Sequence, residues 1–208
     1  MDPYIIPDGS GGAVIAWRDY RNGDYDIYAQ RIDADGNVLW TPDGVAVSVA
    51  QFGQYDPRMV SDGAGGFYIC WWDGRTTNRQ VRCNRLNSDG TLAWGPDGIV
   101  VRDTPWWQES HGIISDGAGG AIIVWDDVNN GFTALYIFAQ RIGPDGSKLW
   151  DPDGVLIEPT GAVDQLNPLS IATSGDGGVI VAWGNWCYLD DMDPAGVNRY
   201  LGREEGSL

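Results

Sequence analysis

The stretch SDGAGGFYICWWD, at residues 61–73, is the clearest of four copies of one pattern in this chain of 208 residues. Each copy has a glycine-rich turn, then an apolar run that ends in tryptophan, then an acidic or amide residue. The other copies are PDGSGGAVIAWRD (7–19), SDGAGGAIIVWDD (115–127) and TSGDGGVIVAWGN (173–185). A pattern that returns at a period of this length is typical of propellers, solenoids and other repeat arrays.

Two independent markers share the period. The tryptophan that ends the apolar run recurs at intervals of 54, 54 and 58 residues, at Trp17, Trp71, Trp125 and Trp183. A second tryptophan recurs at intervals of 54 and 56 residues, at Trp40, Trp94 and Trp150. The chain is therefore predicted to be a single repeat domain, residues 1–208, with units at 2–55, 56–109, 110–166 and 167–208.

Short β-branched and aromatic runs alternate with Asp-Gly turns inside each unit. In the first unit, strands are expected at residues 13–17, 26–32, 37–40 and 45–47. Asp-Gly suits hairpin turns because glycine reaches positive φ without a Cβ clash. No stretch of ten residues has a convincing helical period. We therefore predict an all-β fold of β-propeller-like repeats, with four-stranded antiparallel units and about four blades, the last incomplete.

Both ends of the chain suggest a piece of a longer protein. Met1 lies directly on a repeat boundary, and residues 197–208 resemble a degraded copy of residues 29–39. The chain stops where the strand-closing tryptophan of the fourth unit would follow. An open end leaves an unpaired strand edge, through which a homodimer can form.

The charge balance excludes two classes of partner. The chain has 29 acidic and 13 basic residues and a formal net charge of −16. Nucleic acids and anionic membranes repel such a surface, so neither is expected as a partner. No apolar segment reaches 18 residues, so membrane insertion is not expected either.

The sequence GGAVIAWRDYRNGDYDIYAQRIDADGNVLW, residues 11–40, resembles a repeat of secreted and surface-anchored bacterial proteins. Those proteins are often long and multidomain, and their repeats are regarded as propeller-like. The resemblance covers nearly the whole chain. It implies the propeller-like architecture and export to the cell surface or the medium, and it implies no particular activity.

Polar residues that every copy shares are expected to be structural. Asp19, Asp73 and Asp127 end the core strand, where their side chains can accept hydrogen bonds from turn amides. The alternative is a ring of acids around a central pocket. Three arginines recur on the next strand and are expected to pair with those acids, with a catalytic cluster as the alternative. These arginines are Arg31, Arg85 and Arg141.

Metal and nucleophile chemistry have little support. DADGN, residues 33–37, resembles the start of a calcium loop, but a plain hairpin turn is expected, and calcium is the only cofactor considered. A zinc site is excluded because no Cys-x-x-Cys or histidine cluster exists. Cys70 and Cys83 align with small apolar residues on neighbouring strands and are expected opposite each other, either as a disulfide or as two buried thiols. His111 is the sole histidine, and no nucleophile motif accompanies it.

Function is expected where the copies differ. Four tryptophans depart from the repeat: Trp72, Trp106, Trp107 and Trp186. Polar departures lie nearby, at Arg75, Gln108, Glu109 and His111. Aromatic rings can stack on a sugar while polar side chains bind its hydroxyls. The sequence therefore predicts a saccharide-binding surface, and the alternative is that these tryptophans fill gaps between blades. Its residues would be Trp72, Arg75, Trp106, Trp107 and Glu109.

Three functions remain open from the sequence. The first is a non-catalytic binding or adhesion module of a secreted bacterial protein, extracellular or at the cell surface, with a polysaccharide or glycan as partner. The second is a glycoside hydrolase that uses paired carboxylates drawn from Asp73, Glu109 and Asp127. The third is a structural scaffold for protein interaction, which burial of all the off-repeat tryptophans would favour.

Overall fold

The computed structural model describes residues 3–129, 134–158, 170–174, 177–182 and 200–201, and these residues form an all-β structure without a helix. Four antiparallel sheets follow one another along the chain. The first contains β1 (Tyr4–Pro7), β2 (Ala13–Asp19), β3 (Asp26–Ile32) and β4 (Val45–Ser48). The second contains β5 (Gln54–Ser61), β6 (Phe67–Asp73), β7 (Gln80–Leu86) and β8 (Ile99–Val100). The third contains β9 (Trp107–Ser115), β10 (Ala121–Val128), β11 (Leu135–Ile142) and β12 (Val155–Glu158), and the described part of the last contains β13 (Ser170–Thr173), β14 (Val179–Ala182) and β15 (Tyr200–Leu201).

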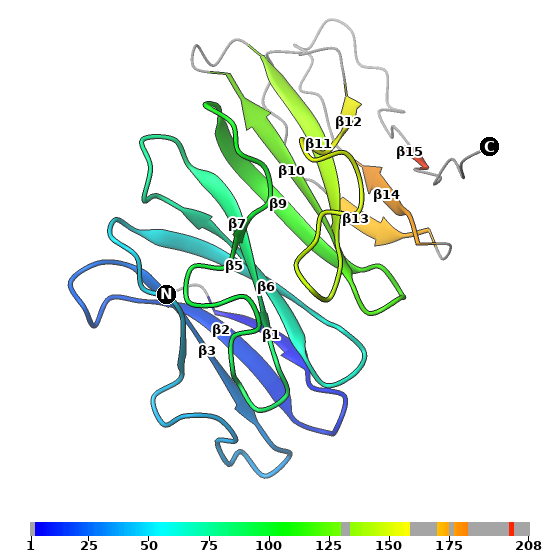
Figure 1. Ribbon diagram of the computed structural model, residues 1–208. Coiled ribbons are helices and arrows are strands. Elements are labelled where there is room, and N and C mark those ends of the chain that lie inside the picture. Colours follow the sequence, from blue (N-terminus) through cyan, green and yellow to red (C-terminus); the bar gives the residue numbers. More distant parts are fainter. Residues whose placement is uncertain (1–2, 130–133, 159–169, 175–176, 183–199, 202–208) are drawn as a thin grey trace, which may run out of the picture.

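The sheets lie side by side in the order of the chain, from the blue sheet to the orange one (Figure 1). The first strands of successive sheets contact one another, since β1 packs against β5, β5 against β9 and β9 against β13. Strands β1, β5, β9 and β13 are therefore the inner strands, as in propeller blades. The all-β, propeller-like part of the sequence prediction is confirmed. The unit boundaries predicted after residues 55 and 109 fall inside β5 and β9.

The core lies between successive sheets as three apolar clusters. Trp71 and Trp125 are fully buried, as the repeat predicts for these positions, while Trp17 is partly buried. Burial of such large aromatic side chains stabilises the fold by several kcal/mol each, on the order of 25 cal/mol per Å². Trp40 joins two sheets, because its indole nitrogen donates to the carbonyl of Ser88 at 3.0 Å and its ring contacts Phe67 at 6.0 Å.

One strand predicted for the first unit is wrong. Residues 37–40 form only a single bridge, between Val38 and Ile32, and the remaining strand of the unit is β1. The reason is a side chain that replaces the ladder: the Gln30 amide oxygen accepts the Trp40 N–H at 3.0 Å, and its nitrogen donates to the Thr41 carbonyl at 2.8 Å. The backbone is satisfied there without strand pairing.

The partners predicted for the repeated arginines are also wrong. Arg31, Arg85 and Arg141 pair with acids of the glycine-rich turns, at 2.8, 2.6 and 2.9 Å, and those acids are Asp8, Asp62 and Asp116. The antiparallel register explains the difference, because it places Arg31 opposite Val14, near the glycine-rich end of the hairpin. Asp19 lies opposite Asp26 at the other end of the same hairpin.

Each of these turn acids joins a turn to a strand. Asp62 accepts the amides of Ala64 and Gly66 at 2.7 and 2.8 Å and binds Arg85. Burial opposes the charge of Asp62, but the amides and Arg85 outweigh it, so the pKa of Asp62 lies below its usual value. The first three glycine-rich turns are therefore each tied to the strand beside them.

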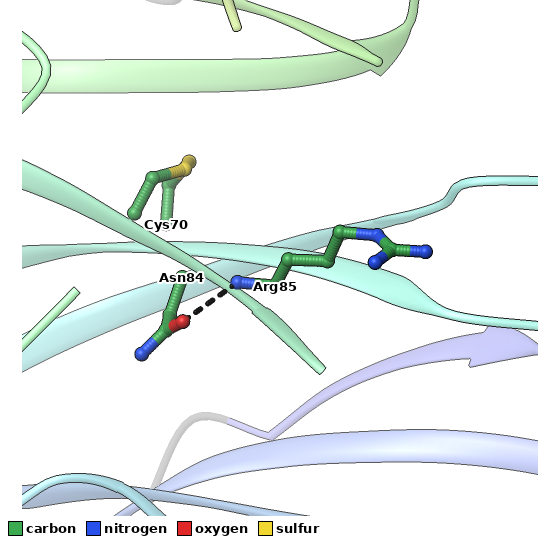
Figure 2. Close-up of a disulfide and its surroundings, with 4 residues drawn as sticks. Cys70, Asn84 and Arg85 are labelled. Carbon is green, nitrogen blue, oxygen red and sulfur yellow. Dashed lines mark hydrogen bonds between the residues drawn. A yellow bond between two sulfur atoms is a disulfide. The ribbon is translucent and has the colours of Figure 1, made fainter. Parts of the chain in front are cut away.

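Cys70 and Cys83 face each other in the β6–β7 ladder and form a disulfide, which selects one of the two alternatives left open by the sequence. Figure 2 shows Cys70 and the Asn84 side chain on opposite sides of β7, with the Arg85 backbone nitrogen donating to Asn84. Both cysteines are fully buried. The disulfide therefore links the two central strands of the second sheet inside the core.

The part of the chain that the structure describes has no helix long and apolar enough to cross a membrane. Several sequence predictions fall outside the described residues. They concern Trp183, Asn185, Trp186 and Cys187.

Candidate functional site

A pocket of about 400 Å³ opens where β2, β5 and β6 approach one another. Its lining combines two guanidinium groups, two aromatic rings and one carboxylate, which belong to Arg18, Arg79, Tyr55, Trp72 and Asp56. The volume is within the range of small-ligand sites. A pocket with flat apolar faces and a few charged groups can hold a sugar ring and orient it.

The strands position this lining by alternation. Arg18, Trp72 and Asp126 each follow the core tryptophan of their unit, so their side chains leave the face that the tryptophan occupies. Arg18 and Trp72 thereby line the pocket, and Asp126 contacts β9 through the amide of Glu109. The position after the core tryptophan therefore carries a different chemical group in each of three units.

Irregular backbone aims Asp56 at the pocket. The register of β5 against β6 shifts between Tyr55 and Arg58, and Asp56 has φ of 50°. Few residues other than glycine adopt such a conformation, and bulges of this kind re-aim side chains next to functional sites. The Arg58 guanidinium lies 3.1 Å from the Asp56 carboxylate and stabilises its negative charge. A second register shift, between Trp125 and Asp127, lies beside Glu109 on the next inner strand.

Glu109 approaches the pocket from β9. Its carboxylate lies 3.8 Å from Arg79, and its backbone carbonyl accepts the Trp72 indole N–H at 3.1 Å. The Glu109 side chain is 39% exposed. Glu109 and Asp56 therefore approach the same group of residues from two neighbouring inner strands.

Asp126 lies behind Glu109 and is only 2% exposed. Its carboxyl accepts the Glu109 amide at 3.1 Å. Burial, together with the negative charge of Glu109, raises the pKa of Asp126 to about 8. Asp126 is therefore protonated at neutral pH and can hold a proton beside an exposed carboxylate.

His111 lies on β9, two residues after Glu109, and packs against Trp72 with ring centroids 5.9 Å apart. It is 7% exposed. Burial lowers the pKa of His111 to about 4, against the opposing attraction of Asp56. The imidazole is therefore neutral at physiological pH and acts as packing beneath Trp72.

Asp73 and Arg75, two of the predicted site residues, lie together in a different place. Asp73 accepts the Trp71 indole N–H at 3.0 Å, and Arg75 binds Asp73 through its backbone and its guanidinium. Arg75 also binds Asp97. Asp73 accepts a hydrogen bond from the turn amide of Arg75, which agrees with the structural role expected for Asp73.

Asp127 has a similar structural environment. Its carboxylate accepts the Trp125 indole N–H at 2.9 Å and the Gln108 amide at 3.2 Å, and it pairs with Arg102. Asp127 is fully buried. Of the three acids predicted for a hydrolase, only Glu109 is therefore next to the pocket.

The off-repeat tryptophans separate into two places. Trp72 lines the pocket, and Trp107 lies beside it because the Arg79 guanidinium is 5.2 Å from the Trp107 ring. Trp106 stacks on Tyr136 at 5.4 Å, at the start of β11 in the third sheet. All three tryptophans are partly exposed, so the burial that would favour a pure scaffold is not found.

The candidate calcium loop folds as a hairpin turn. The Asp33 carboxylate accepts the backbone amides of Asp35 and Asn37, at 2.9 and 2.8 Å, and the Asn37 side chain. Among the described residues, no group of three or more histidine, cysteine, aspartate or glutamate side chains is arranged to hold a metal ion.

Four of the residues that line the pocket were missed from the sequence: Arg18, Tyr55, Asp56 and Arg79. Asp126, which binds the Glu109 amide, was missed as well. Asp56 was taken as the start of a unit because Asp56-Pro57 repeats Asp2-Pro3. The signal that could have found Arg18 and Asp126 is the change of chemistry, from arginine to tryptophan to aspartate, at one repeat position. Arg79 has no such signal, because the turn that precedes it differs in each unit.

Comparison with known proteins supports the fold. No model of a protein family matches the chain, and no curated protein matches it. Among solved structures, an endo-arabinase from Bacteroides thetaiotaomicron superimposes with a TM-score of 0.58 at 15% identity, covering 91% of this chain and 71% of that one. A thermostable family-43 glycoside hydrolase superimposes with a TM-score of 0.53 at 14% identity, covering 96% of this chain and 69% of that one.

These neighbours overturn the first functional prediction. A non-catalytic binding module was expected, whereas both similar structures are enzymes, one an endo-arabinase and the other a glycoside hydrolase. The glycoside hydrolase alternative agrees with them better. At 14–15% identity the likeness itself shows only the shared propeller-like fold, so any activity of this chain must be argued from its own residues.

Proposed function

We propose that this chain belongs to a glycoside hydrolase-type enzyme that cleaves a polysaccharide at the pocket between β2, β5 and β6. The observation that carries the proposal is the pair Asp56 and Glu109, two carboxylates on neighbouring inner strands beside one aromatic-lined pocket. Most enzymes that cleave glycosidic bonds use two carboxylates that flank the bond. The likeness to an endo-arabinase and to a family-43 glycoside hydrolase supports the same class.

The proposed chemistry divides two tasks between the two carboxyl groups. One donates a proton to the oxygen of the departing sugar, and the other acts on the opposite side of the ring, either as a base towards water or as a nucleophile. Tyr55 and Trp72 line the pocket with aromatic side chains that a sugar ring can contact. The ion pair at 3.1 Å places the Arg58 guanidinium beside Asp56, the carboxylate that is assigned as base or nucleophile. Glu109, in its protonated form, is then assigned as the proton donor.

Asp126 is proposed as a positioning residue. It holds the Glu109 backbone amide at 3.1 Å, and its pKa of about 8 keeps it neutral at pH 7. A neutral Asp126 adds no second negative charge beside Glu109. Loss of the Asp126 proton at alkaline pH would change the charge around Glu109, so activity is expected to change on the alkaline side through this group.

The test is release of reducing ends from a panel of plant, algal and bacterial polysaccharides, with the wild-type chain and three variants. Asp56→Asn and Glu109→Gln keep the side-chain shape and are expected to lower the rate by roughly 100-fold or more. Asp35→Asn is the matched control, since Asp35 is exposed in a hairpin turn away from the pocket. Circular dichroism verifies the fold of each variant.

Two outcomes would contradict the proposal. The first is the absence of reducing-end release by the wild-type chain on every polymer. The second is release that persists unchanged in both Asp56→Asn and Glu109→Gln. Release that falls in these variants and not in Asp35→Asn supports the assignment of the pair.

Other parts of the interpretation belong to this proposal. We infer that the four units are successive propeller blades, the last incomplete, and that the chain is extracellular or at the cell surface. The buried Cys70–Cys83 disulfide supports export, because disulfides persist in oxidising compartments. A glycan is the proposed partner, and homodimerisation through an open strand edge stays a prediction.

A further inference from the structure

The cations in the pocket contrast with the charge of the chain. The chain has 29 acidic and only 13 basic residues, yet two arginines, Arg18 and Arg79, line this one pocket together with a single acid, Asp56. Arg18 comes from β2 in the first sheet, and Arg79 precedes β7 in the second. Two guanidinium groups therefore face this one pocket, beside the carboxylates of Asp56 and Glu109.

Aromatic faces hold both guanidinium groups. The Arg18 guanidinium carbon lies 4.6 Å from the centre of the Tyr25 ring and 5.6 Å from that of Tyr55. The Arg79 guanidinium carbon lies 5.5 Å from the centre of the Trp72 ring and 5.2 Å from that of Trp107. A guanidinium that rests on a ring is oriented in advance, and its N–H groups lie along its edge, where they can bind a planar anion.

Arg79 is held less tightly than the arginines that pair with the glycine-rich turns. Arg31, Arg85 and Arg141 donate from their strands to buried carboxylates of those turns at 2.6–2.9 Å. Arg79 instead lies 3.8 Å from Glu109, beyond hydrogen-bond distance, and its side chain is 42% exposed. Arg79 can therefore bind a ligand carboxylate without breaking a close ion pair.

We propose that the pocket recognises a polysaccharide that carries carboxylate groups, a uronate, with Arg79 and Arg18, each oriented by an aromatic ring, binding the sugar carboxylate. The inference rests on the proposed function, because it takes this pocket as the sugar subsite beside Asp56 and Glu109. Carboxylate and guanidinium groups match in geometry and form two parallel hydrogen bonds. The net charge of −16 repels a polyanion at long range, so a local pair of arginines is needed for binding.

The test measures retention on three uronate polymers, polygalacturonate, alginate and glucuronoxylan, each beside its carboxyl-reduced derivative. The reduced polymers keep the sugar backbone and lose the charge. We expect at least one uronate polymer to be bound, and its reduced form to be bound roughly 10-fold or more weakly, as for loss of hydrogen bonds to a charged group. Binding is measured on Glu109→Gln, so that cleavage does not consume the polymer.

The variants are Arg79→Gln and Arg18→Gln in that background, each expected to weaken uronate binding roughly 10-fold or more. Arg79→Lys keeps the charge without the planar fork and should bind at an intermediate level. Arg21→Gln is the matched control, because Arg21 also rests on an aromatic ring, 4.1 Å from that of Tyr28, and does not line the pocket. Circular dichroism checks that the variants remain folded.

The outcomes separate this inference from the proposed function. Equal retention on uronate and carboxyl-reduced polymers, or retention on none of the uronates, overturns the inference even if a neutral polymer is cleaved. Retention that depends on Arg79 and Arg18 supports the inference, even if the wild-type chain cleaves no polymer. That absence of cleavage would contradict only the proposed hydrolysis. Loss of binding in Arg21→Gln equal to that in Arg79→Gln would also overturn it.

Discussion

Replacement of the Cys70–Cys83 disulfide by an apolar pair tests how the second sheet is stabilised. The suitable variant is Cys70→Val with Cys83→Ala, because the equivalent positions of the third sheet are Val124 and Ala139, which face each other in the same way. Both cysteines are fully buried, and the substitution keeps an apolar pair in the same place. The variant therefore removes the covalent link with little other change.

The expected loss follows from the loop that the bond closes. The two cysteines are 13 residues apart, and closing a loop of this size lowers the entropy of the unfolded chain by an amount worth about 3 kcal/mol at 25 °C. A typical domain is stable by about 5–15 kcal/mol, so this loss is a large share of the total. For a chain of this length it corresponds to a fall in Tm of roughly 6–12 °C.

The assay is urea unfolding followed by tryptophan fluorescence, on the oxidised wild type, on wild type refolded with a reductant, and on the double variant. The variant and the reduced wild type should both lose about 3 kcal/mol, and the reductant should leave the variant unchanged. Equal unfolding midpoints for the oxidised wild type and the variant would refute the reasoning. A reductant effect on the variant of the same size would show that the stabilisation comes from elsewhere.

Two further predictions concern stability. The pKa of Asp126 is about 8 in the folded chain against an ordinary 3.8, so the folded state binds an extra proton between these pH values, and the free energy of unfolding falls as pH rises through this window. In urea unfolding, Asp126→Asn should therefore be more stable than the wild type by about 2–4 kcal/mol at pH 7–8 and by little at pH 4. A larger gain at pH 4 than at pH 7 would contradict this prediction. Gly44 has φ of +93°, and a Cβ there would lie 2.6 Å from the Trp17 ring, so Gly44→Ala should cost about 2–4 kcal/mol in the same assay. Gly9→Ala, at φ of +79° with open space, is the control that should cost only about 1 kcal/mol, and equal losses would argue against the Trp17 contact.

The repeat made most of the architecture predictable, because each unit repeats the same local physics. Strand β3 was expected at the residues where it is found, and the pairing of Cys70 with Cys83 follows from counting residues across one hairpin. The strand expected at residues 37–40 failed because the Gln30 side chain takes the backbone bonds that a ladder would use. A side chain whose hydrogen bonds replace strand pairing does not change the alternation of apolar and polar residues, so the sequence pattern does not reveal it.

The candidate site was less predictable than the fold. Glu109 and Trp72 were selected because they break the repeat, and both are next to the pocket. Asp73 and Asp127 had the right chemistry for a hydrolase, but their carboxylates bind the indole of the core tryptophan two residues earlier. Asp56 was passed over because its Asp-Pro pair repeats, although a bulge and a positive φ direct it to the pocket.

The sequence by itself determined the repeated antiparallel hairpins, because hairpins depend on turn residues and on alternation within some fifty residues. It also determined the net charge of −16 and the placement of Cys70 opposite Cys83. Only the tertiary structure decided which acids approach one pocket, because that depends on how the inner strands β5 and β9 pack and on where each bulge turns a side chain. The high pKa of Asp126 has the same origin, since burial and the nearby charge of Glu109 exist only once two strands of the third sheet have paired.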